Sequence, residues 1–122
     1  MSYLAERFQA AVTILVGDGA IKERLAAAYV ENLDDLEETE FPAALRQSFV
    51  DLELALHAEH PIGREPCVRA TVRKMSNIEA RTHAGAIVTL YAELVRHGHR
   101  AQPLRVVPSG RKRPPKYLSE GG

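Results

Sequence analysis

The clearest indication of the fold lies in residues 76–98, which read SNIEARTHAGAIVTLYAELVRHG. Ser76 followed by Glu79 forms a capping box, in which each side chain binds the backbone N–H of the other at the start of a helix. Apolar residues then recur at helical spacing as far as Gly98, which we expect to end the helix. The predicted buried face consists of Ala80, Ala84, Ile87, Val88, Tyr91, Leu94 and Val95.

Three earlier segments also repeat apolar residues with the period of an α-helix. The first follows Ser2, a good N-cap residue, and ends near Gly17; the second begins after Asp18, its expected N-cap. So short a break predicts that these two helices pack as an antiparallel hairpin. The third begins near Pro42, which lacks the N–H that a first helical turn leaves unpaired. The predicted core positions are Leu4, Phe8, Ala11, Val12, Leu15, Ile21, Leu25, Ala28, Tyr29, Leu33, Leu36, Leu45, Phe49, Leu52 and Leu56.

Residues 67–75 fit two kinds of structure. Val68, Ala70 and Val72 alternate with polar residues as they would in a strand, yet Val68, Val72 and Met75 also share one helical face. A single strand would have no pairing partner in this chain, so we favour a short helix.

These elements predict an all-α fold, an antiparallel bundle of about four helices with a short fifth at 67–75. The expected helical domain covers residues 1–99. Residues 100–122 differ in composition, because they are rich in proline and glycine and contain the basic cluster 111–113. They carry too little apolar surface to fold alone. We therefore expect a basic C-terminal tail that is flexible and largely disordered.

Acidic and basic residues are segregated along the chain. Residues 1–60 contain 12 acidic and 4 basic side chains, whereas residues 61–122 contain 4 acidic and 12 basic ones. The net charge of +0 is thus a cancellation between the two halves. Such asymmetry is typical of proteins that bind an anionic partner or carry a charged tail. The alternative is that the two halves pair with each other inside the bundle.

Cysteine content and apolar runs bear on the expected location. The single cysteine, Cys67, cannot form an internal disulfide and suits a reducing compartment. The longest apolar run near the start, residues 10–16, is too short to span a bilayer and follows no basic segment. We therefore expect a cytoplasmic protein that does not engage a membrane.

The basic side chains of the second half are candidate phosphate ligands. Most of them are arginines, whose planar guanidinium group can bind phosphate or carboxylate through two hydrogen bonds. If they share a surface, they could bind nucleic acid through its phosphates. No zinc-finger or RNP motif accompanies them. The candidate residues are Arg69, Arg73, Lys74, Arg111, Lys112 and Arg113.

A second candidate surface lies on the helix predicted for residues 76–98. Glycine within a helix costs about 1 kcal/mol relative to alanine, so Gly85 needs a physical reason. Small residues on its side of the helix would let another helix approach closely, either from a protein partner or second copy, or from the same bundle. This small-residue face consists of Thr82, Gly85, Thr89 and Ala92.

Residues capable of catalysis or metal binding are present but scattered. His57 and His60 would share one face of a helix, with Glu59 nearby, yet the spacing of zinc proteases and any cysteine pair are absent. His83 lacks a phosphotransfer signature, and a packed thiol is the favoured interpretation of Cys67. We therefore expect no enzymatic activity, no cofactor and no bound metal.

Two functional hypotheses follow from the sequence. The favoured one is a small non-enzymatic protein-interaction or regulatory module that acts through helical surfaces and a basic tail, by binding a protein partner or a second copy. The alternative is a nucleic-acid-associated protein that contacts phosphates through its arginine-rich second half.

Overall fold

The computed structural model describes residues 2–60 and 63–101. The described chain forms five α-helices and one 3₁₀ turn, and contains no strand, which confirms the predicted all-α class. The elements are α1 (Tyr3–Leu15), α2 (Ile21–Asn32), η1 (Glu38–Glu40), α3 (Ala43–Leu56), α4 (Cys67–Lys74) and α5 (Asn77–Ala101).

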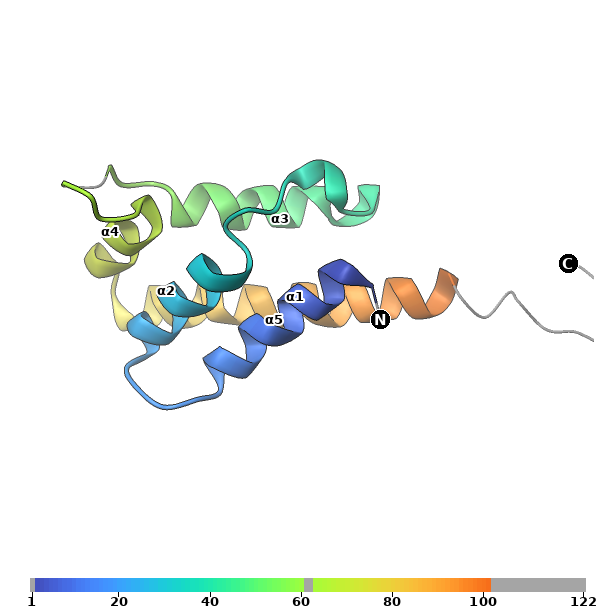
Figure 1. The fold of residues 1–122 in the computed structure, drawn as a ribbon, viewed down its shortest axis with the longest axis horizontal. Helices are drawn as coiled ribbons and strands as arrows, with labels where there is room; N and C mark the ends of the chain where they lie inside the picture. The colour runs from blue at the N-terminus through green and yellow to red at the C-terminus, as the bar shows by residue number, and fades with distance from the viewer. Residues whose placement is uncertain (1, 61–62, 102–122) are drawn as a thin grey trace, which may run out of the picture.

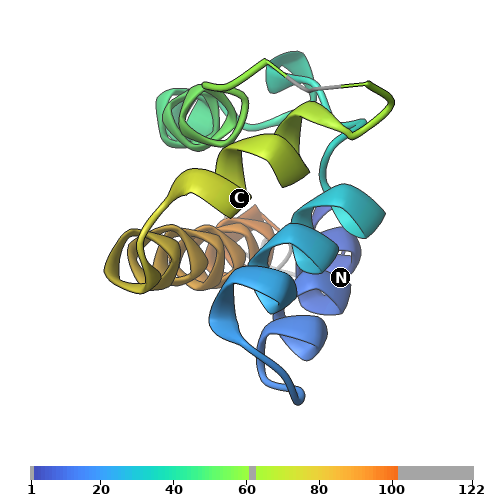
Figure 2. The same ribbon diagram turned by 90° about the vertical axis from the view of Figure 1, so that its left-hand side faces the viewer.

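Helix α5 is the element around which the others are arranged. The antiparallel hairpin of α1 and α2 packs on one part of it, and α3 runs antiparallel to it on another (Figure 1). The short helix α4 lies at one end of the molecule, where it contacts both α2 and α3 (Figure 2). Three helices, α1, α2 and α3, therefore pack on α5, and α4 packs on both α2 and α3.

Helix α4 settles the choice between strand and helix for residues 67–75. Val68 and Val72 are buried, as the helical stripe requires. Thr71 is also buried, and its hydroxyl donates to the Cys67 carbonyl at 2.9 Å while accepting from the Glu59 backbone N–H at 3.0 Å. The buried polar group on this helix is thus satisfied by hydrogen bonds.

Most of the predicted core positions are buried. Exceptions in the first two helices are Val12 and Ile21, which pack against the core but remain partly exposed. Phe41, which was not among the predicted core residues, stacks on Phe49 with ring centroids 4.3 Å apart and meets the edge of Phe8 at 5.9 Å. This aromatic cluster joins α1 to the start of α3.

The helix ends agree with the sequence signals in part. The capping box at the start of α5 is present: the Ser76 backbone N–H donates to Glu79 at 2.8 Å, and the Glu79 N–H donates to Ser76 at 3.0 Å. Helix α2, however, begins at Ile21 with Ala20 as its N-cap, so the expected cap at Asp18 is wrong.

Two expectations about α5 are also wrong. The helix continues through Gly98 to Ala101, because Gly98 does not adopt the positive φ that usually ends a helix at glycine. Val88 and Val95 are exposed rather than buried, and Leu90 occupies the core position instead. Successive helical residues are rotated by about 100°, so Val88 points well away from its buried neighbour Ile87.

Tyr29 of α2 is fully buried, and its hydroxyl has no hydrogen-bond partner among the described residues. Its ring meets the edge of His57, whose Nε2 lies 2.8 Å from Asp34 Oδ1 and whose Nδ1 lies 2.7 Å from the Glu53 carbonyl. Burial, and then the negative charges of Glu53 and Asp34, raise the pKa of the Tyr29 hydroxyl above its ordinary value. The fold therefore favours the neutral phenol.

Near pH 7, the free energy of unfolding of Tyr29→Phe is expected to be about 1 kcal/mol higher than that of the original chain. The substitution stabilises because it removes a buried hydroxyl that lacks a hydrogen bond. A raised pKa contributes stability below the ordinary tyrosine pKa of about 10 that is lost as the pH rises above it. The variant should therefore lose less stability under alkaline conditions. Urea unfolding near pH 7 and above about pH 10 measures the stability of the variant and the original chain at each pH. Tyr3→Phe, at an exposed position, is the control. A lower stability of Tyr29→Phe near neutral pH would contradict the expectation.

Candidate interaction surface on helix α5

The small-residue face of α5 points away from the core. Thr82, Gly85, Thr89 and Ala92 are all exposed. A Cβ atom built on Gly85 would meet no atom within 4 Å. In the described part of the chain, no helix packs against this face, so close packing inside the bundle does not explain the glycine.

Larger apolar side chains extend the small-residue face along the helix. Ile78 is 68% exposed, Val88 45% and Val95 39%, although each is a residue that usually favours the core. A row of exposed apolar side chains of this kind is typical of a binding surface. We call the combined set the outer face of α5: Ile78, Thr82, Gly85, Val88, Thr89, Ala92 and Val95.

Val88 and Val95 are surface residues that the sequence pattern wrongly placed on the buried face. A signal for their position was present in the sequence. Val88 lies three residues after Gly85, and Val95 lies three after Ala92, so both share a side of the helix with the small residues. The exposed assignment therefore follows once Leu90 is included in the core stripe.

Charged side chains also lie on this side of α5. Arg81 precedes Gly85 by four residues, is exposed, and has no ion-pair or hydrogen-bond partner among the described residues. Arg96 follows Ala92 by four residues, just beyond Val95, and lies 3.4 Å from Glu93, an exposed pair at i, i+3 spacing that contributes little to stability. The outer face therefore combines small and apolar side chains with basic ones.

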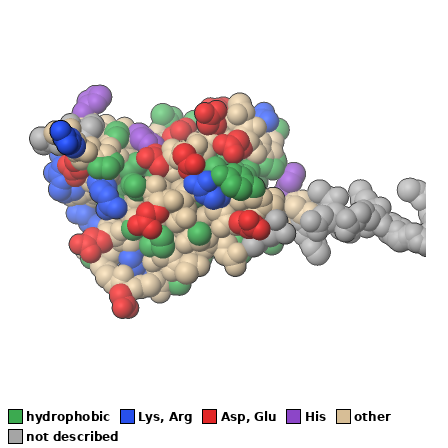
Figure 3. All heavy atoms as spheres, in the orientation of Figure 1, with side chains coloured by type: hydrophobic (Ala, Val, Ile, Leu, Met, Phe, Trp, Pro, Cys, Tyr) green, Lys and Arg blue, Asp and Glu red, His purple; other side chains and the backbone are tan. Residues whose placement is uncertain are grey.

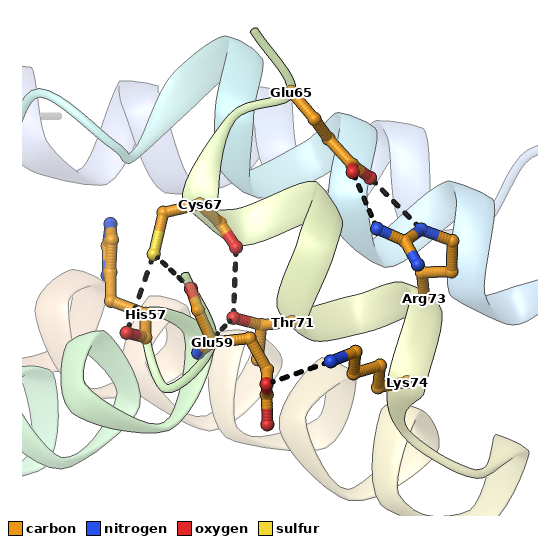
Figure 4. Close-up of polar contacts among 7 residues, drawn as sticks. All are labelled: His57, Glu59, Glu65, Cys67, Thr71, Arg73 and Lys74. Atoms are coloured by element: carbon orange, nitrogen blue, oxygen red, sulfur yellow. Dashed lines mark hydrogen bonds and ion pairs between the residues drawn. The ribbon is translucent and has the colours of Figure 1, made fainter. Parts of the chain in front are cut away.

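The candidate phosphate ligands on α4 are only partly available. Arg73 forms two hydrogen bonds with Glu65, at 2.6 and 3.2 Å, and Lys74 lies 3.3 Å from Glu59 (Figure 4). The hydrogen bonds from Arg73 lower the pKa of the Glu65 carboxyl group and raise that of Arg73. Arg69 is exposed and unpaired among the described residues. Two of the three candidates on this helix therefore already bind carboxylates.

The surroundings of α4 mix both signs of charge. Lys and Arg side chains gather at the end of the molecule formed by α4, with acidic side chains close by (Figure 3). A groove between α2 and α4 is lined by Lys22, Arg69 and Arg73 but also by Glu23 and Glu65. The remaining candidates lie outside the described residues: Arg111, Lys112 and Arg113.

The two oppositely charged halves of the chain pair little with each other. Among the described residues, the ion pair between Lys74 and Glu59 joins a base of the second half to an acid of the first. Each of the other ion pairs among the described residues joins two side chains of the same half: Arg7–Asp35, His57–Asp34, Arg73–Glu65 and Arg96–Glu93. Direct ion pairing between the two halves is therefore limited to Lys74 and Glu59 among the described residues.

The polar residues around Cys67 have structural roles. The thiol donates to the Glu59 carbonyl at 2.8 Å and lies 3.4 Å from the His57 carbonyl, which ties the start of α4 to the end of α3 (Figure 4). His83 is half-buried in a shallow groove that Lys74 also lines. Within the described ranges, no three His, Cys, Asp or Glu side chains are grouped so that they could hold a metal ion.

Comparison of the chain with protein-family models, with curated proteins and with solved structures finds no match. Within residues 2–60 and 63–101, no helix has the length and apolar character needed to cross a membrane.

Gly85→Ala is expected to raise the free energy of unfolding by about 0.5–1 kcal/mol, because alanine is the better helix former and its Cβ would meet no neighbour within 4 Å. Gly98→Ala is the matched control, since a Cβ at this α5 position is equally free of contacts. Its gain should be smaller, because the last turn of a helix frays. Urea unfolding of dilute samples measures both. A loss of stability in Gly85→Ala alone would show that the folded monomer packs against this glycine.

Proposed function

We propose that this protein is a small non-enzymatic protein-interaction module whose main binding surface is the outer face of α5. The observation that carries the proposal is the open space at Gly85. Gly85 lies in the middle of the outer face of α5, where Ile78, Val88 and Val95 are also exposed. A glycine that costs helix stability and serves no packing inside the described bundle is accounted for by a partner that approaches closely.

The fold supports this role by holding α5 rigidly. Its buried stripe packs against α1, α2 and α3, so the outer face does not have to become ordered when a partner binds. Small residues at its centre allow two helices to approach within about 8–10 Å, and the larger side chains beside them supply apolar contact. A helix of a protein partner is the shape that fits such a surface.

The basic segment at residues 100–122 forms the second part of the proposal. Its arginines and lysines would attract a partner that carries acidic groups and so increase the rate of association. We also propose a cytoplasmic location, supported by the free thiol of Cys67.

Photo-crosslinking of the full chain tests the module directly. A photoreactive phenylalanine analogue replaces Ala92 on the outer face, and in the matched control it replaces Ser48, an exposed residue of α3. In extract of the natural host, the Ala92 position should give adducts with a protein identified by mass spectrometry, and the Ser48 position should not. Adding Gly85→Leu should abolish the adducts, because the larger side chain prevents close approach. Absence of any protein adduct at Ala92, with itself or another protein, would overturn the proposal.

Nucleic-acid association is a second candidate function, favoured by the exposed and unpaired Arg69 beside the basic end of the molecule (Figure 3). Under this candidate, Arg69→Gln should weaken binding of labelled duplex DNA and reduce the slope of log affinity against log salt by about 1. Arg46→Gln removes the same charge from an exposed position in the acidic half and serves as the control. Fluorescence anisotropy across a salt series measures both variants. Equal effects of the two substitutions would exclude a phosphate contact at Arg69.

A further inference from the structure

We infer that the partner of the outer face is an acidic amphipathic helix of another protein. The inference rests on the proposed function and specifies the chemistry of its partner. Two exposed arginines, Arg81 and Arg96, lie on the same side of α5 as the small residues. A helix that approaches Gly85 closely meets both of them, and their guanidinium groups bind carboxylates through paired hydrogen bonds.

The two arginines are placed symmetrically about the small residues. Arg81 precedes Gly85 by four residues, and Arg96 follows Ala92 by four. At about 100° per residue, each arginine lies within about 40° of both small residues around the helix axis. At 1.5 Å per residue, the two arginines are about 22 Å apart along the helix. A helix that packs on Gly85 and Ala92 is therefore close to one basic group near each end of the contact.

Acidic side chains of α5 lie away from this side. Glu93 is about 80–100° around the helix from Gly85 and Ala92. It contacts Arg96 through one guanidinium nitrogen, at 3.4 Å, so the other N–H groups of Arg96 can bind a second carboxylate. Arg81 has no ionic or hydrogen-bond partner among the described residues. The outer face therefore presents a net positive charge to its partner.

The surface between the arginines favours a protein helix over a lipid or nucleic-acid surface. Helices that lie on a bilayer bury bulky apolar residues such as leucine, phenylalanine and tryptophan, whereas Gly85, Thr89 and Ala92 occupy the centre here. Nucleic acids are bound by neutralising many neighbouring phosphates, whereas these arginines are about 22 Å apart. Small residues in the middle allow close approach of a helix backbone, and charges one turn outside suit the polar rim of a protein interface.

The spacing predicts the order of residues in the partner helix. Two small residues should be seven positions apart, with an aspartate or glutamate four positions outside each of them. This order reads the same in both directions, so it suits a parallel or an antiparallel helix. At a crossing angle of about 20°, the two helices diverge sideways by only about 4 Å at each arginine, within reach of its long side chain. No segment of this chain has that order, so a second copy does not supply it.

Fluorescence anisotropy with three labelled synthetic helices tests the inference on the full chain. The acidic peptide has alanine at the two inner positions of the predicted order and glutamate at the two outer ones. The displaced peptide has the same composition, with both glutamates moved to the opposite side of the helix. The basic peptide has lysine in place of each glutamate. At low salt, the acidic peptide should bind at least about tenfold more tightly than either of the others.

Charge variants of the chain locate the contact. Arg81→Gln combined with Arg96→Gln should weaken binding of the acidic peptide at least about tenfold. The matched control is Arg64→Gln combined with Arg69→Gln, which removes the same charge at exposed positions outside α5 and should change binding less than about twofold. Arg81→Glu combined with Arg96→Glu should exchange the preference, so that the basic peptide binds and the acidic one does not. A defect of folding would not create this new preference.

Equal binding of the acidic and displaced peptides, or an equal loss of binding in the matched control, would overturn the inference. Binding that depends on Arg81 and Arg96 to phosphatidylserine vesicles or duplex DNA, with no binding of the peptides, would assign the surface to a lipid or a nucleic acid instead. Adducts at Ala92 that contain only this chain would replace the acidic helix by a second copy. Adducts at Ala92 with another protein, together with equal binding of the peptides, would overturn the acidic helix but leave the proposed interaction function intact.

Discussion

The structure depends on the burial of one stripe of α5 beneath the α1–α2 hairpin and α3. Two of the stripe's five residues are alanines, which let the covering helices lie close to the α5 backbone. Because α1, α2 and α3 all cover this one side, the opposite side is left without an intramolecular partner in the described chain. The interaction that stabilises the fold therefore also creates the exposed apolar face. The buried residues are Ala80, Ala84, Ile87, Leu90 and Leu94.

Hydrogen bonds around α4 give Cys67 and Thr71 a structural role. Cys67 and Thr71 both bind the backbone of Glu59, and Cys67 also contacts the His57 carbonyl. These bonds satisfy backbone groups where α3 ends and the chain enters α4, groups that a helix terminus otherwise leaves unpaired. The geometry of this cluster is that of a helix connection, since the Cys67 thiol and the Thr71 hydroxyl both have backbone partners.

Helical periodicity predicted the fold class and most core positions, but the buried stripe that it indicated for α5 was too wide. Ile87 and Val88 are adjacent and equally apolar, so composition alone cannot distinguish the buried residue from the exposed one. The packing of α1 and α3 makes that choice. Gly98 illustrates the same limit, because a glycine ends a helix only where the chain turns. The positive φ angles occur instead at Gly19 and Gly63, in the connections before α2 and α4.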